Sequence, residues 1–150
     1  MTFKDAADAI ATLGNSDDEA TKISVMRAID AAMTSSDVSA HAKIALSEPL
    51  VAALLAAASD KKSNDVRTAA SATLRTLATK THDFVVASAI IPACLAALDP
   101  KARWQTQVAA AEVLSKLSDC APQTVAANMI SILPVVASMV NDAKKEVADA

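Results

Sequence analysis

Basic side chains recur along the sequence at intervals of about forty residues, at places where turns are predicted. Such side chains can contact the phosphate groups of a nucleic acid even though the whole chain carries a net charge of −3. The single tryptophan adjoins one of these groups, where it either packs against the neighbouring helix or stacks on a base. The candidate partner-binding residues are Lys61, Lys62, Arg67, Lys101, Arg103, Trp104, Lys144 and Lys145.

A simpler explanation of the basic groups is that they are ordinary solvated turn residues. Each group lies beside an aspartate, which is Asp60, Asp99 or Asp142, and exposed ion pairs contribute little to stability. We expect each aspartate to accept hydrogen bonds from the free amides at the start of the next helix. The acidic run at residues 17–19 could bind a cation, but charges at the favourable end of a helix dipole explain it better.

Histidine and cysteine are too few and too scattered to predict a metal site. His41 and His82 are 41 residues apart and should occupy equivalent turns of neighbouring repeats. Stacked helices lie ~10 Å apart, whereas zinc holds its ligands at ~2.1 Å, so the two histidines cannot share a metal. Cys94 and Cys120 stand in apolar or alanine-rich surroundings, which predicts two buried, reduced thiols.

The single glycine, Gly14, excludes the glycine-rich loops of catalysis. The chain cannot form a phosphate-binding loop, a dinucleotide-binding fingerprint or a nucleophile elbow. We therefore predict no catalytic residue, no cofactor and no small-molecule substrate within this chain. The N-terminus lacks the apolar segment of a signal peptide, and no stretch approaches ~18 uncharged apolar residues, which predicts a cytoplasmic protein without a membrane partner.

The elements that position the basic groups are predicted to be helices. Alanine, which has the highest helix propensity, is abundant, and aromatic residues make up only 2 % of the chain. Three helix-forming stretches superpose, because Met33, Leu74 and Leu114 follow one another at steps of 41 and 40 residues. This spacing indicates an all-α protein built from a repeated unit.

A second set of helices carries one proline each, at Pro49, Pro92 and Pro134, with steps of 43 and 42 residues. Because proline removes an amide donor from a helix, its recurrence marks either a repeated kink or a repeated helix start. The two sets alternate, with the proline helix as the outer member of each pair and the alanine-rich helix as the inner member. Stacked pairs of this length are typical of HEAT repeats.

We therefore predict one all-α, HEAT-type solenoid of antiparallel helix pairs with about 3.5 repeats. The expected repeats cover residues 1–40, 41–80, 81–122 and 123–150, the fourth being cut inside its inner helix. Its outer helix, ISILPVVASMV, should then keep one apolar face bare. A solenoid normally ends in a polar capping repeat, so we expect the chain to be either a piece of a longer protein or a truncated gene product.

About fifty residues at the end of the chain resemble the N-terminal HEAT region of translation elongation factor 3. That family opens an inner helix with Lys-Trp-Gln and continues with Ala-Pro, Ile-Pro-Val and Asp-Thr-Lys-Lys-Glu-Val. The matching residues are Arg103, Trp104, Gln105, Ala121, Pro122, Leu133, Pro134, Val135, Asp142, Ala143, Lys144, Lys145, Glu146 and Val147. Arg103 and Ala143 replace the lysine and the threonine of the family, and the first hundred residues match only in pattern.

This resemblance implies a part of a ribosome-dependent ATPase whose ATP-binding cassettes follow the HEAT array, so that ATP would bind outside this chain. It also implies that the HEAT part contacts proteins of the small-subunit head and ribosomal RNA. Our leading hypothesis is a non-catalytic ribosome-docking module. The alternative is a HEAT scaffold for protein–protein interaction, including one similar to the general-control kinase activator, which favours the Cys-Ala-Pro seen at Cys120, Ala121 and Pro122.

Overall fold

The computed structural model describes residues 3–34, 40–80 and 85–139, with side chains described for 7–34, 48–80 and 85–139. Within these ranges all regular structure is helical, and no strand occurs. The elements are α1 (Phe3–Asn15), α2 (Glu19–Thr34), α3 (Ala40–Ala58), α4 (Asn64–Lys80), the π-helical segment η1 (Val86–Ile90), α6 (Ile91–Ala97), α7 (Trp104–Cys120), α8 (Pro122–Ala127) and α9 (Met129–Met139).

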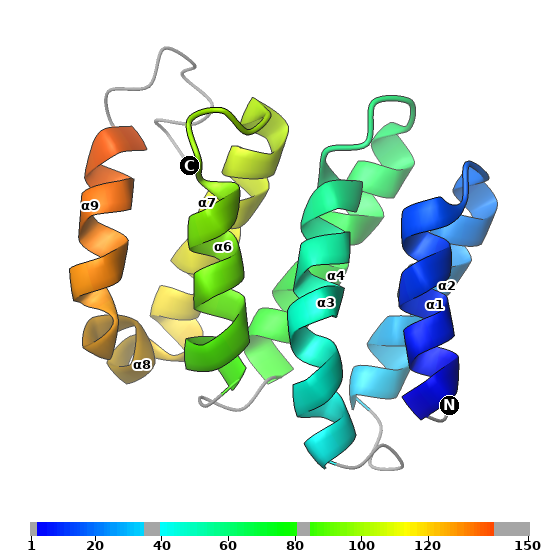
Figure 1. Cartoon of the computed structure of the whole chain (residues 1–150), viewed down its shortest axis with the longest axis horizontal. Coiled ribbons are helices and arrows are strands. Elements are labelled where there is room, and N and C mark those ends of the chain that lie inside the picture. Colours follow the sequence, from blue (N-terminus) through cyan, green and yellow to red (C-terminus); the bar gives the residue numbers. More distant parts are fainter. Residues whose placement is uncertain (1–2, 35–39, 81–84, 140–150) are drawn as a thin grey trace.

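The helices form two layers that run side by side along the molecule (Figure 1). One layer contains α1, α3, α6 and α9, and the other contains α2, α4 and α7. Across the layers α1 contacts α2, α3 contacts α4 and α6 contacts α7, and helices within a layer also contact one another, as α2 contacts α4 and α4 contacts α7. This arrangement confirms the predicted all-α solenoid of stacked antiparallel pairs. None of the described helices is long and apolar enough to cross a membrane.

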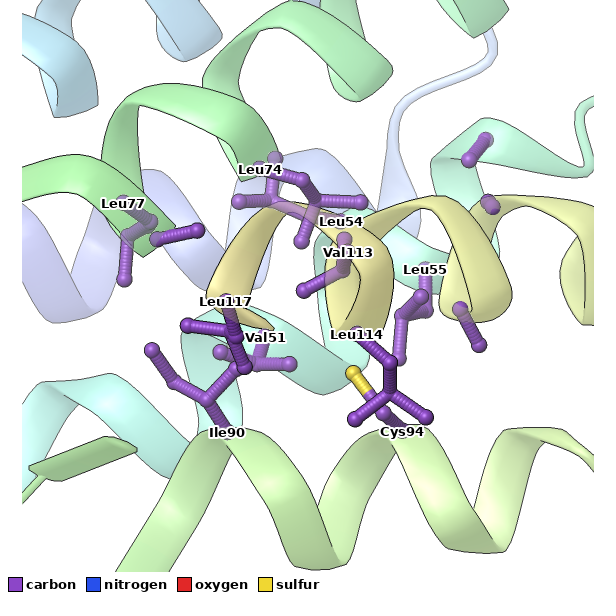
Figure 2. Close-up of a cluster of buried hydrophobic side chains, with 14 of the residues drawn as sticks. Val51, Leu54, Leu55, Leu74, Leu77, Ile90, Cys94, Val113, Leu114 and Leu117 are labelled. Carbon is purple, nitrogen blue, oxygen red and sulfur yellow. The ribbon is translucent and has the colours of Figure 1, made fainter. Parts of the chain in front are cut away.

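A continuous apolar core fills the space between the two layers. Figure 2 shows its central part, where Leu54 of α3, Leu74 of α4, Ile90 of η1 and Leu117 of α7 come together. The buried positions of α4, singly or as adjacent pairs, recur every three or four residues, which places them on one face of the helix. The core therefore ties neighbouring repeats into one body, and the turns at the helix ends are held at fixed places.

The recurring prolines lie in the layer of α3, α6 and α9, as predicted for the outer helices. Pro49 and Pro134 stand inside α3 and α9, whereas Pro92 occupies the first turn of α6, directly after η1. All three prolines are exposed. Only Pro92 therefore marks a helix start, and the prolines do not mark one and the same local structure in every repeat. The π-helical turn before Pro92 was not predicted.

One side of α9 exposes large apolar side chains, as the sequence predicts. Ile130 is 91 % exposed and Leu133 is 60 % exposed, and Met129 and Val136 lie on the same side of the helix. By the spacing of the prolines, Val136 corresponds to Cys94 of α6, which is fully buried against the inner layer. The third repeat therefore buries the position that α9 leaves exposed at Val136.

The prediction for the two cysteines is half wrong. Cys94 is buried, but Cys120 is exposed. Cys120 is the last residue of α7, and an alanine-rich neighbourhood in the sequence does not bury a side chain at a helix end.

Candidate functional site

Three turns, two of which carry candidate basic residues, lie along one edge of the solenoid, at the top of Figure 1. They connect α1 to α2 at residues 16–18, α3 to α4 at residues 59–63, and α6 to α7 at residues 98–103. We call these three segments the turn edge. Lys61 and Lys62 lie in the second turn, and Lys101 and Arg103 lie in the third. Lys144 and Lys145 lie outside the described residues.

An aspartate organises the second and the third turn in the same way. The carboxylate Oδ1 of Asp60 accepts hydrogen bonds from the backbone N–H groups of Lys62 (2.8 Å) and Ser63 (3.1 Å). The carboxylate Oδ1 of Asp99 accepts one from the N–H of Lys101 at 2.7 Å. Lys62 and Lys101 are thus equivalent residues, each two positions after an aspartate that fixes its backbone. The sequence pattern Asp-x-Lys, which recurs at residues 142–144, is the signal in the sequence that indicates this equivalence.

This geometry corrects the expected role of the aspartates. Asp60 and Asp99 bond amides within the turns, not amides inside the next helix. Ser63 performs the capping of α4, because its Oγ accepts a hydrogen bond from the N–H of Val66 at 3.2 Å. Asp142 lies outside the described residues.

A partly buried ion pair joins the second turn to the first repeat. The Nζ of Lys22, on α2, lies 2.7 Å from Oδ2 of Asp60, and the two side chains are only 16 % and 13 % exposed. The hydrogen bond from Lys22, followed by the amide of Lys62, lowers the pKa of Asp60 to about 2. Asp60 therefore stays charged at every physiological pH, and the pair fixes the turn against α2.

Arginine guanidinium groups bind backbone carbonyls at the same place. Nη1 of Arg67 donates to the carbonyl oxygen of Asp60, and Nη1 of Arg103 donates to that of Ser59, both at 2.8 Å. The second bond connects the third turn to the end of α3, across the boundary between two repeats. In the third turn the place of Arg67 is taken by Gln107, whose Nε2 donates to the carbonyl of Asp99 at 2.8 Å. Gln107 is buried, so this amide serves the fold.

The lysines of the turn edge are much freer than the arginines. Lys61 and Lys101 are exposed, and neither side chain has an ion-pair partner within the described part of the chain. Lys62 lies 3.3 Å from Oδ1 of Asp17, with side chains that are 78 % and 94 % exposed. Such a pair is worth only ~0.2–1 kcal/mol. The two residues line a cleft of about 240 Å³ between the first and second turns, together with Glu19.

The acidic first turn behaves as the sequence predicts for Asp18. Its Oδ2 accepts hydrogen bonds from the hydroxyl of Thr21 and from the Thr21 N–H, the latter at 2.8 Å. These bonds, the one from the hydroxyl first, lower the pKa of Asp18. Asp18 therefore caps the start of α2. Because Asp17 and Glu19 are also exposed, the turn edge is acidic at its first turn and basic at its third.

Trp104 is the first residue of α7 and is 38 % exposed. Part of its indole is therefore accessible next to Arg103, and the choice between packing and stacking on a base stays a prediction. Among the described residues, no group of three histidine, cysteine, aspartate or glutamate side chains could hold a metal ion. Burial raises the pKa of Cys94 to about 12, so this thiol is no nucleophile. His41 and His82 lie outside the described side chains.

Comparison with known proteins identifies the family. The model of the EF3 N-terminal HEAT repeat matches residues 3–150. Elongation factor 3B of Saccharomyces cerevisiae is 32 % identical over 106 residues, which is 69 % of this chain. Elongation factor 3 of Zygosaccharomyces rouxii and of Candida glabrata are each 33 % identical over the same length. The chain spans 10 % of the length of these relatives.

These matches confirm the resemblance that the sequence suggested at Trp104, Pro134 and the residues around them. A HEAT repeat region is a helical scaffold, so the chain is a non-catalytic module of the translation-factor type. The chain belongs to the EF3 N-terminal HEAT repeat family.

Proposed function

We propose that this chain docks an elongation-factor-3-like protein onto the ribosome through the turn edge. The observation that supports the proposal best is the recurrence of exposed lysines at equivalent places in successive turns, in a member of a translation-factor family. Lysines on a rigid edge can neutralise phosphate groups of ribosomal RNA, which releases counterions and favours binding. The proposed docking surface comprises the turn edge and the residues next to it, and its candidate residues are Lys61, Lys62, Arg67, Lys101, Arg103, Trp104, Lys144 and Lys145.

The proposal assigns no chemistry to this chain. Binding and hydrolysis of ATP are assigned to cassettes in other parts of the longer family members, and the chain itself is proposed to bind no cofactor. It acts in the cytoplasm, where ribosomes elongate proteins. Its partners are ribosomal RNA and the proteins of the small-subunit head.

Charge reversal at the turn edge tests the proposal. We expect the triple variant Lys61→Glu, Lys62→Glu and Lys101→Glu to co-sediment with purified ribosomes much less than the unchanged chain. The three side chains are exposed, and surface substitutions of this kind usually change stability by at most ~0.5 kcal/mol. The helical circular dichroism spectrum should therefore be unchanged.

The matched control reverses Arg27, Lys80 and Lys116, which changes the net charge by the same amount. Arg27 lies within α2, Lys80 ends α4 and Lys116 lies near the end of α7, so none belongs to the turn edge. If the control weakens binding as much as the triple variant, the attraction is unspecific and the docking edge lies elsewhere. If the unchanged chain does not co-sediment at all, a scaffold that binds other proteins becomes the better hypothesis.

A further inference from the structure

The basic residues in the turn edge and in the first turn of α4 fall into two classes that the sequence cannot separate. The first class comprises lysines with exposed ammonium groups, such as Lys62 and Lys101. The second comprises arginines that bind backbone carbonyls, Arg67 at Asp60 and Arg103 at Ser59. A side chain that satisfies a carbonyl of the fold has fewer donors left for a partner. The two classes therefore have different tasks.

Lys62 and Lys101 project from equivalent places. The N–H of each is held by the carboxylate of the aspartate two residues earlier, at 2.8 Å and 2.7 Å. Neighbouring packed helices are ~10 Å apart, so the two backbone positions are separated by about one repeat. A pair of cations at a fixed spacing fits a polyanion with regularly spaced charges better than a single carboxylate.

Arg103 fixes the third turn relative to the second. Its guanidinium spans the boundary between two repeats and binds the carbonyl of Ser59 at 2.8 Å, three residues before Lys62. Within the third turn, Asp99 accepts the N–H of Lys101 through its carboxylate and that of Ala102 through its carbonyl, the latter at 2.8 Å. Loss of the Arg103 bond would free this short turn from α3 and loosen the spacing between the lysines.

We propose that Lys62 and Lys101 contact phosphate groups of ribosomal RNA, and that Arg103 is a positioning residue that holds them at a fixed spacing without contacting the partner. This inference rests on the proposed function. The proposal also assigns a role to Asp17. Its carboxylate lies 3.3 Å from the ammonium of Lys62 and competes with the phosphate for that cation.

The salt dependence of ribosome binding separates a phosphate contact from a positioning role. Each lost phosphate contact lowers the slope of log affinity against log salt by about 0.7–0.9, so the loss of affinity between 50 and 200 mM salt becomes about 3-fold smaller. We expect this change for Lys62→Gln and for Lys101→Gln in the whole 150-residue chain, titrated with purified ribosomes. We expect Arg103→Gln to weaken binding several-fold at every salt concentration and to leave the slope unchanged.

A variant that is expected to bind more tightly provides a control, because misfolding could explain weaker binding but not stronger binding. Asp17→Asn releases Lys62 from its competitor, and the side chain of Asp17 is 94 % exposed, so the fold should not respond. We expect tighter binding to ribosomes and a steeper salt slope. Weaker binding of Asp17→Asn would overturn the assignment to phosphate, because it would indicate a basic protein surface as the partner.

Hydrogen exchange tests the role of Arg103 without any ribosome. We expect the amides of Lys101 and Ala102 to exchange faster in Arg103→Gln than in the unchanged chain, and to exchange normally in Lys62→Gln. Unchanged exchange in Arg103→Gln, or a salt slope that falls as much as in Lys101→Gln, would overturn the positioning role. If the unchanged chain does not bind ribosomes, the proposed function fails, and the exchange experiment still decides whether Arg103 holds the turn.

Discussion

The ion pair between Lys22 and Asp60 should make a measurable contribution to stability, which Asp60→Asn removes. The amide oxygen of asparagine can still accept the N–H groups of Lys62 and Ser63, which Asp60 binds at 2.8 and 3.1 Å. The variant therefore loses the negative charge and keeps the turn. What it removes is the attraction to the ammonium of Lys22 at 2.7 Å, between side chains that are 16 % and 13 % exposed, and the strengthening of the two amide hydrogen bonds by the negative charge.

The pKa of Asp60 sets the size of the effect. It is about 2, against an ordinary value of 3.8, and each pH unit of difference corresponds to 1.36 kcal/mol, so the charged form stabilises the fold by about 2 kcal/mol. A carboxyl group with a depressed pKa stabilises the folded state above its unfolded value, and the benefit is lost as the pH falls through the folded value. The contribution of Asp60 is therefore complete at neutral pH and disappears between pH 3.8 and about 2.

Urea denaturation followed by far-ultraviolet circular dichroism measures the prediction. At neutral pH the free energy of unfolding of Asp60→Asn should be about 2 kcal/mol lower than that of the unchanged chain. The two free energies should converge as the pH falls toward the pKa of Asp60. A matched control, Asp17→Asn, removes a carboxylate from a pair whose side chains are 78 % and 94 % exposed and should cost at most ~1 kcal/mol.

Two results would refute this reasoning. One is equal stability of Asp60→Asn and the unchanged chain at neutral pH. The other is a stability difference that persists undiminished in acid, because then the charge of Asp60 is not its cause. Lys22→Met tests the same pair from the other side and should destabilise the chain by at least as much, since it leaves the carboxylate of Asp60 partly buried without its counter-charge.

Three further predictions concern the core, the thiols and the tryptophan. Leu117→Ala, at a fully buried position of α7, should lower the free energy of unfolding by about 2–5 kcal/mol. Its control, Ser115→Ala on the exposed side of the same helix, should have little effect. Similar losses of stability in the two variants would contradict the packing of Figure 2. A maleimide should label Cys120 in the folded chain and reach Cys94 only after unfolding, because Cys94 is buried with a pKa of about 12. Rapid labelling of Cys94 in the folded chain, detected by mass spectrometry, would refute its burial. The fluorescence of Trp104, which is 38 % exposed, should be quenched by acrylamide in the free chain and protected when ribosomes are added; unchanged quenching would place Trp104 outside the contact.

The sequence predicts the helices because their buried positions repeat. Leu74 and Leu114 lie one repeat apart and are both buried in the core, and Pro49, Pro92 and Pro134 all lie in the outer layer. These regularities follow from the geometry of stacked helix pairs, in which each repeat must bury the same face. The π-helical turn at Val86–Ile90 has no such counterpart among the described residues of the other repeats, so no periodic pattern could predict it.

The site is less predictable because its contacts cross between repeats. The hydrogen bond from Arg103 to the carbonyl of Ser59 joins residues 44 positions apart. Because every residue has a backbone carbonyl, the residue type at position 59 does not identify it as the acceptor. The same holds for Lys22 and Asp60, whose pairing depends on how α2 packs beside the second turn. Cys120 was placed wrongly for a related reason, since exposure at the end of α7 depends on what packs there and not on the neighbouring residue types.

The central claim is that the turn edge meets ribosomal RNA, and site-specific crosslinking measures this most directly. A photoreactive residue is placed at Lys101 in one variant and at Lys80, at the far end of α4, in another. After irradiation with purified ribosomes, the account predicts a crosslink from position 101 to ribosomal RNA and none from position 80. Crosslinks from position 80 alone, or from position 101 only to ribosomal protein, would contradict it.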